Sequence, residues 1–530
     1  MQRTTARPPR RALRASAALL LPATALILAS CAAPATSDAD ATGDPVAGGD
    51  ITFARLSSPV TSLDPHDDTL ITINAYTLDK VFDTLYALDE EGEPQPSLAT
   101  SYEVSDDGLT WTFSLRDGVV FSDGSAFDAA DVVYSIGRHL DLGGALPLGA
   151  PIIGVTAVDD HTVEIVLSEP YTPLLSELSV FSSSILPEDL AGLDEDEFFA
   201  DPIGTGPFTV EEWDPSSTEL TLARNDEYWV EGLPYLDTVR LTTVDDDNQL
   251  VQQVQSGQAD IVDDVPIANV EELEANGDVR VQSVGSWNQD IVFFNTTSDV
   301  FSDRGVRRAV VQAVDRDALT EATTFGTGTP ARTFIASTIR YSDQDVDALE
   351  YDVDAAKDEL AASEHPEGAA ATLLVEGGSQ SRAQQAQIIQ ASLAEIGVDV
   401  EIETVDSATF WTRFPAGDYE FALSTTIADT GDPDNVSSWQ VDGDGVTQAF
   451  YTYYDNDEVD ALVKEGRITP DGDERAAIYS QIQEIVAQDS PSLSLDYVSE
   501  IKAAGAHVHG LQLIPNGTVR LENVWIDPQS

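Results

Sequence analysis

Residues 382–403 read RAQQAQIIQASLAEIGVDVEIE, and this stretch decides the fold class. Apolar residues recur at helical spacing as far as Ile396, and Gly397 then ends the helix. Val398–Glu403 alternates between apolar and acidic residues, which is typical of a strand with one buried face. A helix followed directly by a strand predicts an α/β lobe whose strands direct their loops toward a ligand cleft.

Further along the chain, residues 425–435 form an acidic segment that reads TTIADTGDPDN. Asp418–Leu423 alternates as a short strand before it, and the Gly, Pro, Asp and Asn that follow favour a turn. The segment therefore places three carboxylates on a loop at a strand end, with Trp439 a few residues later. Such a loop suits a small cationic group, although the residues alone leave open a solvated acidic turn.

The composition bounds the class of protein. A chain of 530 residues predicts two or three domains, and its 42% hydrophobic content excludes wholesale disorder. The formal net charge is −68, and the lysines are confined to Lys80, Lys357, Lys464 and Lys502. Nucleic acid is excluded as a partner because phosphate binding needs clustered Lys and Arg. The acidity favours cationic ligands, and adaptation to salt would explain it equally well.

The first thirty residues have the pattern of an export signal. Five arginines precede the apolar run Ala15–Ala29, which is too short to span a bilayer comfortably. The run ends in Leu-Ala-Ser-Cys, and Cys31 is the single cysteine of the chain. This ending resembles a bacterial lipobox, which implies a signal peptide over residues 1–30, lipidation of Cys31 and a place on the extracytoplasmic face of the cell membrane. An ordinary signal peptide, and export through either the Sec or the twin-arginine route, stay open.

Residues 31–49 are rich in Ala, Thr, Asp, Gly and Pro, so we interpret them as a flexible tether. The globular part is expected to begin at Asp50, and we expect a monomer. A lone cysteine excludes a disulfide within the chain, so packed cores must supply the stability.

Short motifs follow one another in a fixed order after the tether. They are Pro96–Ala99, Asp107–Phe113, Leu115–Val119, Phe121–Gly124, Ala130–Ser135, Ile203–Phe208, Asn225–Trp229, Gln255–Ile261, Phe294–Thr296 and Phe301–Ala309. In this order they resemble the family 5 extracellular solute-binding proteins, which are the peptide- and nickel-binding receptors of ABC importers. The resemblance extends from about Ile51 to Pro491.

The resemblance implies an α/β fold of the periplasmic-binding-protein type, a bilobal clamshell (type II) with an extra domain inserted in lobe one. On that template lobe one comprises residues 50–85, 202–284 and 492–530. The inserted domain comprises residues 86–201, and lobe two comprises residues 285–491. Gly285 and Pro491 lie at the two crossings between the lobes and suit a hinge.

The resemblance also implies that the protein binds a ligand reversibly and catalyses no reaction. A small ligand, a di- or oligopeptide first of all, would be captured in the cleft and delivered to a membrane permease with its ATPase subunits. In peptide-binding relatives an aspartate shortly before an Asp-Pro turn pairs with the α-ammonium group of the ligand, and Asp429 matches it in order and spacing. Those relatives usually have Trp two residues earlier, where this chain has Ile427. No cofactor and no metal are implied.

Aromatic residues are the other candidates for ligand contact. Trp287 lies at the first lobe crossing, and Trp439 and Trp411 flank the acidic segment, although a buried core position is the default for tryptophan. We expect Arg307, Arg308 and Arg316, placed in one helix from Gly305 to about Thr324, to form ion pairs and not to bind ligand.

Several alternatives stay open at this point. The same fold could take an oligosaccharide or a chelated metal such as nickel, or could serve as a surface sensor or adhesin without transport. His507 and His509 form a possible metal pair, although no third ligand is evident and we expect exposed histidines. An enzyme is not expected, because the chain has no His-Glu-x-x-His, no Gly-x-Ser-x-Gly and no cysteine nucleophile in its globular part.

Overall fold

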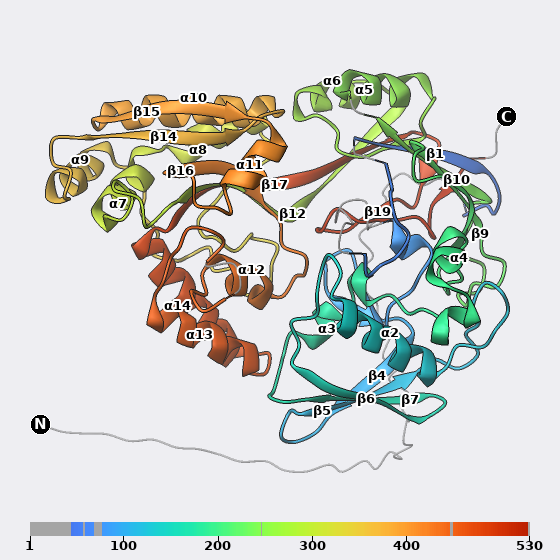
Figure 1. Ribbon diagram of the computed structural model, residues 1–530. Coiled ribbons are helices and arrows are strands. Elements are labelled where there is room, and N and C mark those ends of the chain that lie inside the picture. Colours follow the sequence, from blue (N-terminus) through green and yellow to red (C-terminus); the bar gives the residue numbers. More distant parts are fainter. Residues whose placement is uncertain (1–43, 57–58, 68–76, 245, 446–448, 528–530) are drawn as a thin grey trace, which may run out of the picture. The chain divides into compact units, whose positions relative to one another are not determined.

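The computed structural model describes residues 44–56, 59–67, 77–244, 246–445 and 449–527 (Figure 1). The predicted signal peptide, the lipidation site at Cys31 and the tether as far as residue 43 lie outside these residues. Among the described helices, none has the length and hydropathy that a membrane crossing requires.

One mixed sheet of eleven strands organises the described chain, in the order β15-β14-β16-β12-β17-β11-β1-β10-β9-β8, with β13 also paired to β17 (Figure 1). At one end of this order, which we call the second side of the sheet, are β15 (Val398–Val405), β14 (Ala369–Glu376) and β16 (Phe421–Thr426). The first side is formed by β11 (Ile261–Val262), β1 (Asp50–Leu56), β10 (Thr238–Val244), β9 (Glu219–Arg224) and β8 (Phe208–Trp213). The centre contains β12 (Val279–Phe294), β17 (Ser492–Gly505) and β13 (Thr329–Pro330).

The long strands β12 and β17 join the two sides of the sheet. They pair antiparallel from Val279 opposite Gly505 to Phe293 opposite Ser492, with register shifts between Gly285 and Gln289 and between Asp290 and Ile291. From Gln289 onward β12 also pairs with β16, whereas the other end of β17 pairs with β11. Residues 290–294, which by themselves have the pattern of a short strand, are therefore only the last third of a much longer one.

Helices cover the second side of the sheet. They are α7 (Arg304–Ala313), α8 (Arg316–Thr324), α9 (Val353–Ala362), α10 (Gln380–Glu395) and α11 (Ser407–Arg413). Helix α10 packs on β14, β15 and β16, so the helix and strand predicted at residues 382–403 are confirmed. Hydrophobic clusters fill both faces of this side.

The single helix predicted from Gly305 to Thr324 is wrong, because the chain forms two helices there. Val314 has extended backbone angles, and the Asp315 side chain accepts a hydrogen bond from the Ala318 N–H and so begins α8. Arg307 and Arg316 are buried and donate to backbone carbonyls, including those of Asp489, Ser490, Ala331 and Leu349. Only Arg308 forms the expected kind of ion pair, with Glu359 at 2.9 Å.

The first side of the sheet has its own cores, with α5 (Asp247–Ser256), α6 (Val270–Glu274) and the 3₁₀ turn η4 (Ile267–Asn269) packed nearby. Residues 69–86 have apolar residues at helical spacing, but in their described part only the 3₁₀ turn η1 (Leu78–Lys80) occurs before strand β2. Residues 69–76 lie outside the described residues.

A separate four-stranded sheet, the small sheet, forms between β1 and β8 in the sequence, in the order β4-β5-β7-β6. Its strands are β4 (Ala99–Val104), β5 (Thr110–Leu115), β7 (Thr162–Leu167) and β6 (Ile152–Asp159). Helix α2 (Ala129–Leu142) packs on it and is capped by Asp128, in a capping box with Asp131. Around the small sheet lie the hairpin β2 (Tyr86–Leu88) and β3 (Pro94–Pro96), and α3 (Leu174–Glu177), η2 (Phe181–Ser183), η3 (Glu188–Gly192) and α4 (Glu195–Ala200).

The late part of the chain contributes α12 (Pro433–Gln440), α13 (Asp457–Ile468) and α14 (Asp473–Asp489), which pack against one another. Short strands β18 (Val508–His509), β19 (Gln512–Leu513), β20 (Val519–Arg520) and β21 (Trp525–Ile526) follow β17. One hydrophobic cluster joins α13 and α14 to Leu88 of the β2–β3 hairpin and to Ile514 near the C-terminus. Residues 89–93 of the hairpin and the loop after β16 thereby come close together.

Candidate ligand-binding site

The acidic segment forms the loop between β16 and α12. Asp432 caps the helix, because its Oδ1 accepts a hydrogen bond of 2.9 Å from the Asp434 N–H, and Pro433 occupies the first helical position. The Asn435 side chain then reaches back and accepts a hydrogen bond of 3.1 Å from the Asp429 N–H. The Asp-Pro-Asp-Asn sequence thus fixes both the start of α12 and the backbone of Asp429.

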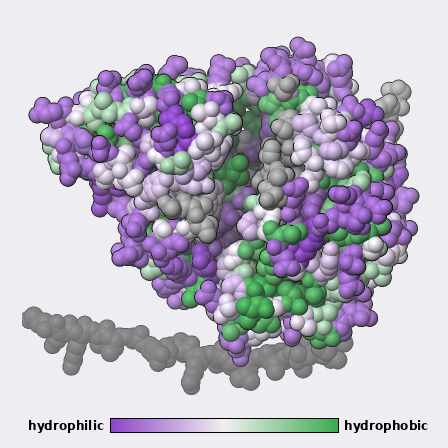
Figure 2. Space-filling model, viewed as in Figure 1, coloured by the Kyte–Doolittle hydropathy of each residue, from purple (hydrophilic) through white to green (hydrophobic). Residues whose placement is uncertain are grey.

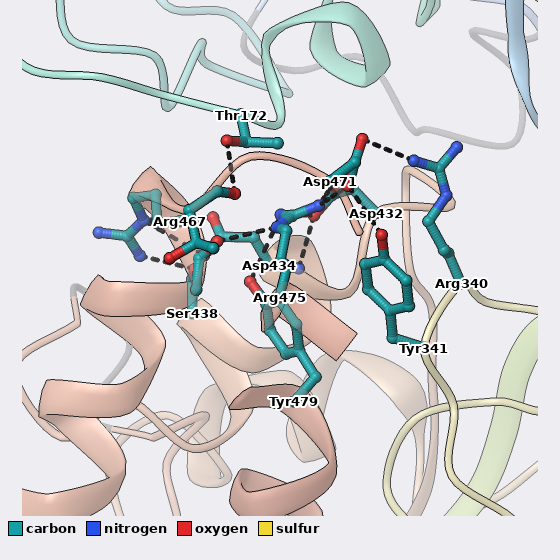
Figure 3. Close-up of polar contacts among 12 residues, drawn as sticks. Thr172, Arg340, Tyr341, Asp432, Asp434, Ser438, Arg467, Asp471, Arg475 and Tyr479 are labelled. Atoms are coloured by element: carbon teal, nitrogen blue, oxygen red, sulfur yellow. Dashed lines mark hydrogen bonds and ion pairs between the residues drawn. The ribbon is translucent and has the colours of Figure 1, made fainter. Parts of the chain in front are cut away.

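Asp432 and Asp434 are compensated by buried or half-buried arginines (Figure 3). Arg475, whose side chain has 0% exposure, binds the two oxygens of Asp432 at 2.7 and 2.8 Å. Arg467 donates to both oxygens of Asp434 at 3.2 Å. The two aspartates therefore stabilise the structure of the loop, as expected for residues that form its turn.

Asp429 differs from both. Its side chain is half-buried, and in the described part of the chain no group donates a hydrogen bond to its carboxylate or pairs with it. Burial raises the pKa of Asp429 to about 7. A carboxylate that has lost hydration without gaining a partner favours any cationic donor that reaches it.

A polar network links this loop to the β2–β3 hairpin (Figure 3). Asp471 accepts from Arg475 at 2.8 Å and from Arg340 at 2.8 Å. The Arg340 backbone N–H donates to the Gly431 carbonyl at 3.3 Å, and its guanidinium pairs with Glu93 of the hairpin. The network therefore connects the loop that carries Asp429 to a segment on the other side of the site.

A second contact joins Thr172, which follows the small sheet, to the end of α13 (Figure 3). The Thr172 backbone N–H donates to the Arg467 carbonyl at 2.9 Å, and its hydroxyl donates to the Thr469 carbonyl at 2.8 Å. Both acceptors lie at the end of α13, so the arginine that compensates Asp434 also belongs to this contact.

The structure brings only one of the three predicted tryptophans next to the loop. Trp287 is 2% exposed, and its indole lies between two glycines. A Cβ on Gly92 or Gly431 would come within 2.5 or 2.9 Å of this ring, respectively. The two glycines therefore allow the hairpin and the loop to close on Trp287, which packs in the shared hydrophobic cluster.

The other two predicted tryptophans lie on helices α12 and α11. Trp439, near the end of α12, is half-buried with its ring edge-on to Phe450 at a centroid distance of 4.5 Å. Trp411, on α11, is 44% exposed. Ile427, two residues before Asp429, is 46% exposed and places no aromatic surface beside the carboxylate.

A small cavity of about 40 Å³ lies next to the hydrophobic cluster that contains Trp287. Its lining includes Leu88 and Ile514 from the cluster around Trp287, and the polar residues Asp83, Asn516 and Arg520. Sequence reasoning missed these residues, as it missed Glu93 and Arg340. These residues come together only through tertiary packing. The sequence therefore gives no local sign of them beyond the arginines, which are notable in a chain with few basic residues.

The two C-terminal histidines do not form the expected exposed pair. His509 is buried, stacks on Trp525 and lies 3.1 Å from Asp527, whereas His507 lies 2.9 Å from Asp260. Each imidazole thus has its own carboxylate partner. The expectation of exposure was wrong for His509 because β18 pairs with β21 and covers it.

Comparisons with known proteins agree with this architecture. The model of bacterial extracellular solute-binding proteins, family 5, matches residues 93–448. The glutathione-binding protein GsiB of Escherichia coli K12 is 28% identical over 531 residues, covering 96% of this chain and 98% of the relative.

Solved structures give the same fold. The periplasmic binding protein DppA of Helicobacter pylori, in complex with the peptide STSA, matches with a TM-score of 0.77 and 27% identity, covering 91% of this chain and 99% of that one. NikA of Brucella suis with Fe(III)-EDTA, at 23% identity and a TM-score of 0.79, covers 90% of this chain and 100% of that one and supports the fold alone. These matches confirm the predicted type II clamshell and place the chain among transport-associated binding proteins, not enzymes. The chain belongs to the bacterial extracellular solute-binding proteins, family 5.

Proposed function

We propose that this protein captures a di- or oligopeptide by its α-ammonium group, with Asp429 as the anchor, and delivers it to an ABC importer. The proposal rests on one observation, which is that the three aspartates of this loop differ in whether a cationic side chain pairs with them. Asp432 and Asp434 are each paired with an arginine, whereas Asp429 is the described carboxylate of this loop without a partner. An ammonium group would supply the missing charge and the missing hydrogen bonds.

The names of the relatives support a peptide before other ligands. GsiB is named as a glutathione-binding protein, and the DppA structure contains the peptide STSA. A peptide with a free N-terminus carries the cationic group that Asp429 lacks. An oligosaccharide would instead need aromatic surface for stacking, and the exposed neighbour of Asp429 is Ile427.

Capture would proceed by closure of two lobes around the ligand. We propose lobe one as residues 50–85, 202–284 and 492–530, the inserted domain as 86–201, and lobe two as 285–491, with Gly285 and Pro491 at the hinge. Gly285 lies at a register shift of β12, and Pro491 directly precedes β17. A ligand that contacts Asp429 and the opposite wall would favour the closed population, in which Trp287 and the Glu93–Arg340 pair join the two walls. Trp439 and Trp411 remain candidates for ligand contact on lobe two.

We further propose that a lipid on Cys31 holds the protein at the outer face of the cell membrane, as an otherwise monomeric receptor for permease and ATPase subunits. The lipobox-like sequence before Cys31 supports this. Replacement of Cys31 by Ala should move the protein from the membrane fraction to the soluble extracytoplasmic fraction. Unchanged membrane retention would contradict the lipid anchor and leave the ligand proposal untouched.

Native mass spectrometry of the purified protein tests the class of ligand directly. We expect a mass difference that matches one or more short peptides and that disappears after denaturation and refolding. A co-purified sugar or metal chelate would contradict the peptide proposal while agreeing with the family.

A further inference from the structure

Two carboxylates face each other across the central strands of the sheet. Asp290 on β12 lies directly opposite Asp496 on β17. Gln385, from α10, donates through the same Nε2 to Asp290 Oδ2 at 2.7 Å and to Asp496 Oδ2 at 3.3 Å. Both carboxylates therefore lie within hydrogen-bonding reach of one amide nitrogen.

Two of these three residues are fully buried, Asp290 is half-buried, and the group is short of hydrogen-bond donors. Asp496 and Gln385 each have 0% exposure. The Thr425 hydroxyl donates to Asp290 Oδ1 at 2.6 Å, so that carboxylate has a donor at each oxygen. In contrast, Asp496 Oδ1 and Gln385 Oε1 have no partner in the described part of the chain. Two buried acceptors thus remain after both hydrogens of the Gln385 amide have been used.

The charged groups of the surrounding elements do not compensate for a second negative charge. On α10 Arg382 pairs with Glu376 of β14 at 3.0 Å and donates to Thr425. On α8 Arg316 binds two backbone carbonyls, and Asp317 and Glu321 are exposed. Strand β13 consists of Thr329 and Pro330 and so contributes no charged group. The hydroxyl of Tyr497, the residue after Asp496, contacts residues 332, 333 and 344.

We infer that Asp290 and Asp496 form a proton-binding site in the centre of the sheet, which holds one proton on Asp496. The proton would supply the donor that the group lacks, because an Asp496 O–H could donate to Gln385 Oε1 while Gln385 Nε2 donates to Asp496 Oδ2. One proton then satisfies both remaining acceptors and reduces two facing charges to one. This site lies beside β16, the strand that leads into the ligand loop, and the inference does not depend on what the protein binds.

The electrostatics of the pair agree with this inference. Burial, and after it the charge of Asp290, raises the pKa of Asp496 to about 8. In the unfolded chain an aspartate ionises at about pH 4. The free energy of unfolding should therefore fall as the pH rises from about 4 to about 8, and then level off for this group. Above that range two charges would face each other on the strands that join the two sides of the sheet.

Thermal unfolding of Asp496→Asn tests the site. Asparagine keeps the shape but cannot ionise, so we expect its Tm relative to the wild type to rise steadily between pH 5 and pH 8 and to stay constant above. The matched control is Asp399→Asn, an exposed aspartate on β15, whose Tm should follow that of the wild type at every pH. A Tm difference for Asp496→Asn that is the same at all pH values would overturn the inference.

A measurement on the wild type covers the case in which Asp496→Asn fails to fold. Carbon-13 NMR of protein labelled at the aspartate carboxyl groups should show a carboxyl that titrates near pH 8, above the carboxyl of Asp429, which titrates near pH 7. The absence of a carboxyl that titrates near pH 8 would overturn the proton site. The wild-type Tm at pH 8 should also stay the same when choline replaces sodium at constant ionic strength. A change would overturn the proton site, because it would mean that a sodium ion and not a proton occupies it.

Discussion

Asp429 illustrates how the surroundings of a residue decide its role. Three aspartates lie within six residues, and each has a different environment. Asp432 is held by a fully buried arginine, Asp434 by a half-buried one, and Asp429 by none in the described chain. The local turn signal was sufficient to predict the loop, and the resemblance to peptide-binding relatives selected Asp429. Neither could predict Arg475, because the partners are 43 positions apart and meet only through tertiary packing.

The raised pKa of Asp429 predicts that ligand affinity depends on pH. Only the ionised carboxylate attracts an ammonium group, and the pKa of the empty site is about 7. Affinity for a peptide should therefore be highest between about pH 7 and pH 8. It should fall by up to about tenfold per pH unit below pH 6, because binding must first remove the proton from Asp429, and it should fall again above about pH 8, because the free α-amino group of a peptide ionises at about 7.7–8.0. Calorimetric titrations between pH 5 and pH 8.5 measure this dependence. An affinity that does not change over that range would contradict the role of Asp429.

At the scale of elements, the site depends on how α12, α14 and the β2–β3 hairpin hold one loop. Arg475 of α14 fixes the start of α12, and Arg340 joins the loop to the hairpin. The sequence predicted α10 and β15 well because both follow from local periodicity. It underestimated β12, since the alternation breaks at Gly285–Trp287 where the register shifts, and strand pairing continues through that break.

Arg475 should contribute strongly to the stability of this arrangement. Arg475→Met leaves the Asp432 carboxylate buried without a partner, and we expect it to lower the free energy of unfolding by about 3–5 kcal/mol. Adding Asp432→Asn removes that charge while keeping a side chain that can cap α12, so the double variant should recover part of the loss. Denaturant unfolding compares the three proteins. A double variant no more stable than Arg475→Met would contradict the ion-pair explanation.

The Glu93–Arg340 pair should stabilise the closed form. Both side chains are partly exposed, with 41% and 31% exposure, so the effect is expected to be modest. Glu93→Gln should raise the dissociation rate of the ligand about two- to fivefold with little change in the association rate, as measured by stopped-flow fluorescence. Exchanging the two charges, Glu93→Arg with Arg340→Glu, should restore part of the affinity.

The control for this prediction is Glu350→Gln. It removes an ion pair with Arg332 that is likewise exposed but lies within a single lobe as proposed above. Its dissociation rate should equal that of the wild type. Equal effects of Glu93→Gln and Glu350→Gln would mean that the Glu93–Arg340 pair has no special part in closure.

At the scale of the whole molecule, the chain combines a conserved type of architecture with an acidic surface. Hydrophilic residues cover most of the face shown in Figure 2, in keeping with the net charge of −68. The order of short motifs was enough to predict the family and the clamshell, because many weak matches in one order are jointly specific. Contacts between distant segments could not be predicted in this way, since they join residues such as Glu93 and Arg340, which are 247 positions apart.

The central claim is that Asp429 binds the ammonium group of a peptide, and a calorimetric cycle tests it most directly. The affinities of the wild type and of Asp429→Asn are measured for one peptide ligand and for its N-acetylated form, with the exposed variant Asp399→Asn as control. The account predicts that the Asp429→Asn substitution and acetylation each weaken binding by about tenfold or more, and that acetylation has little further effect on the variant. An Asp429→Asn variant that still prefers the free N-terminus by the same factor as the wild type would contradict it.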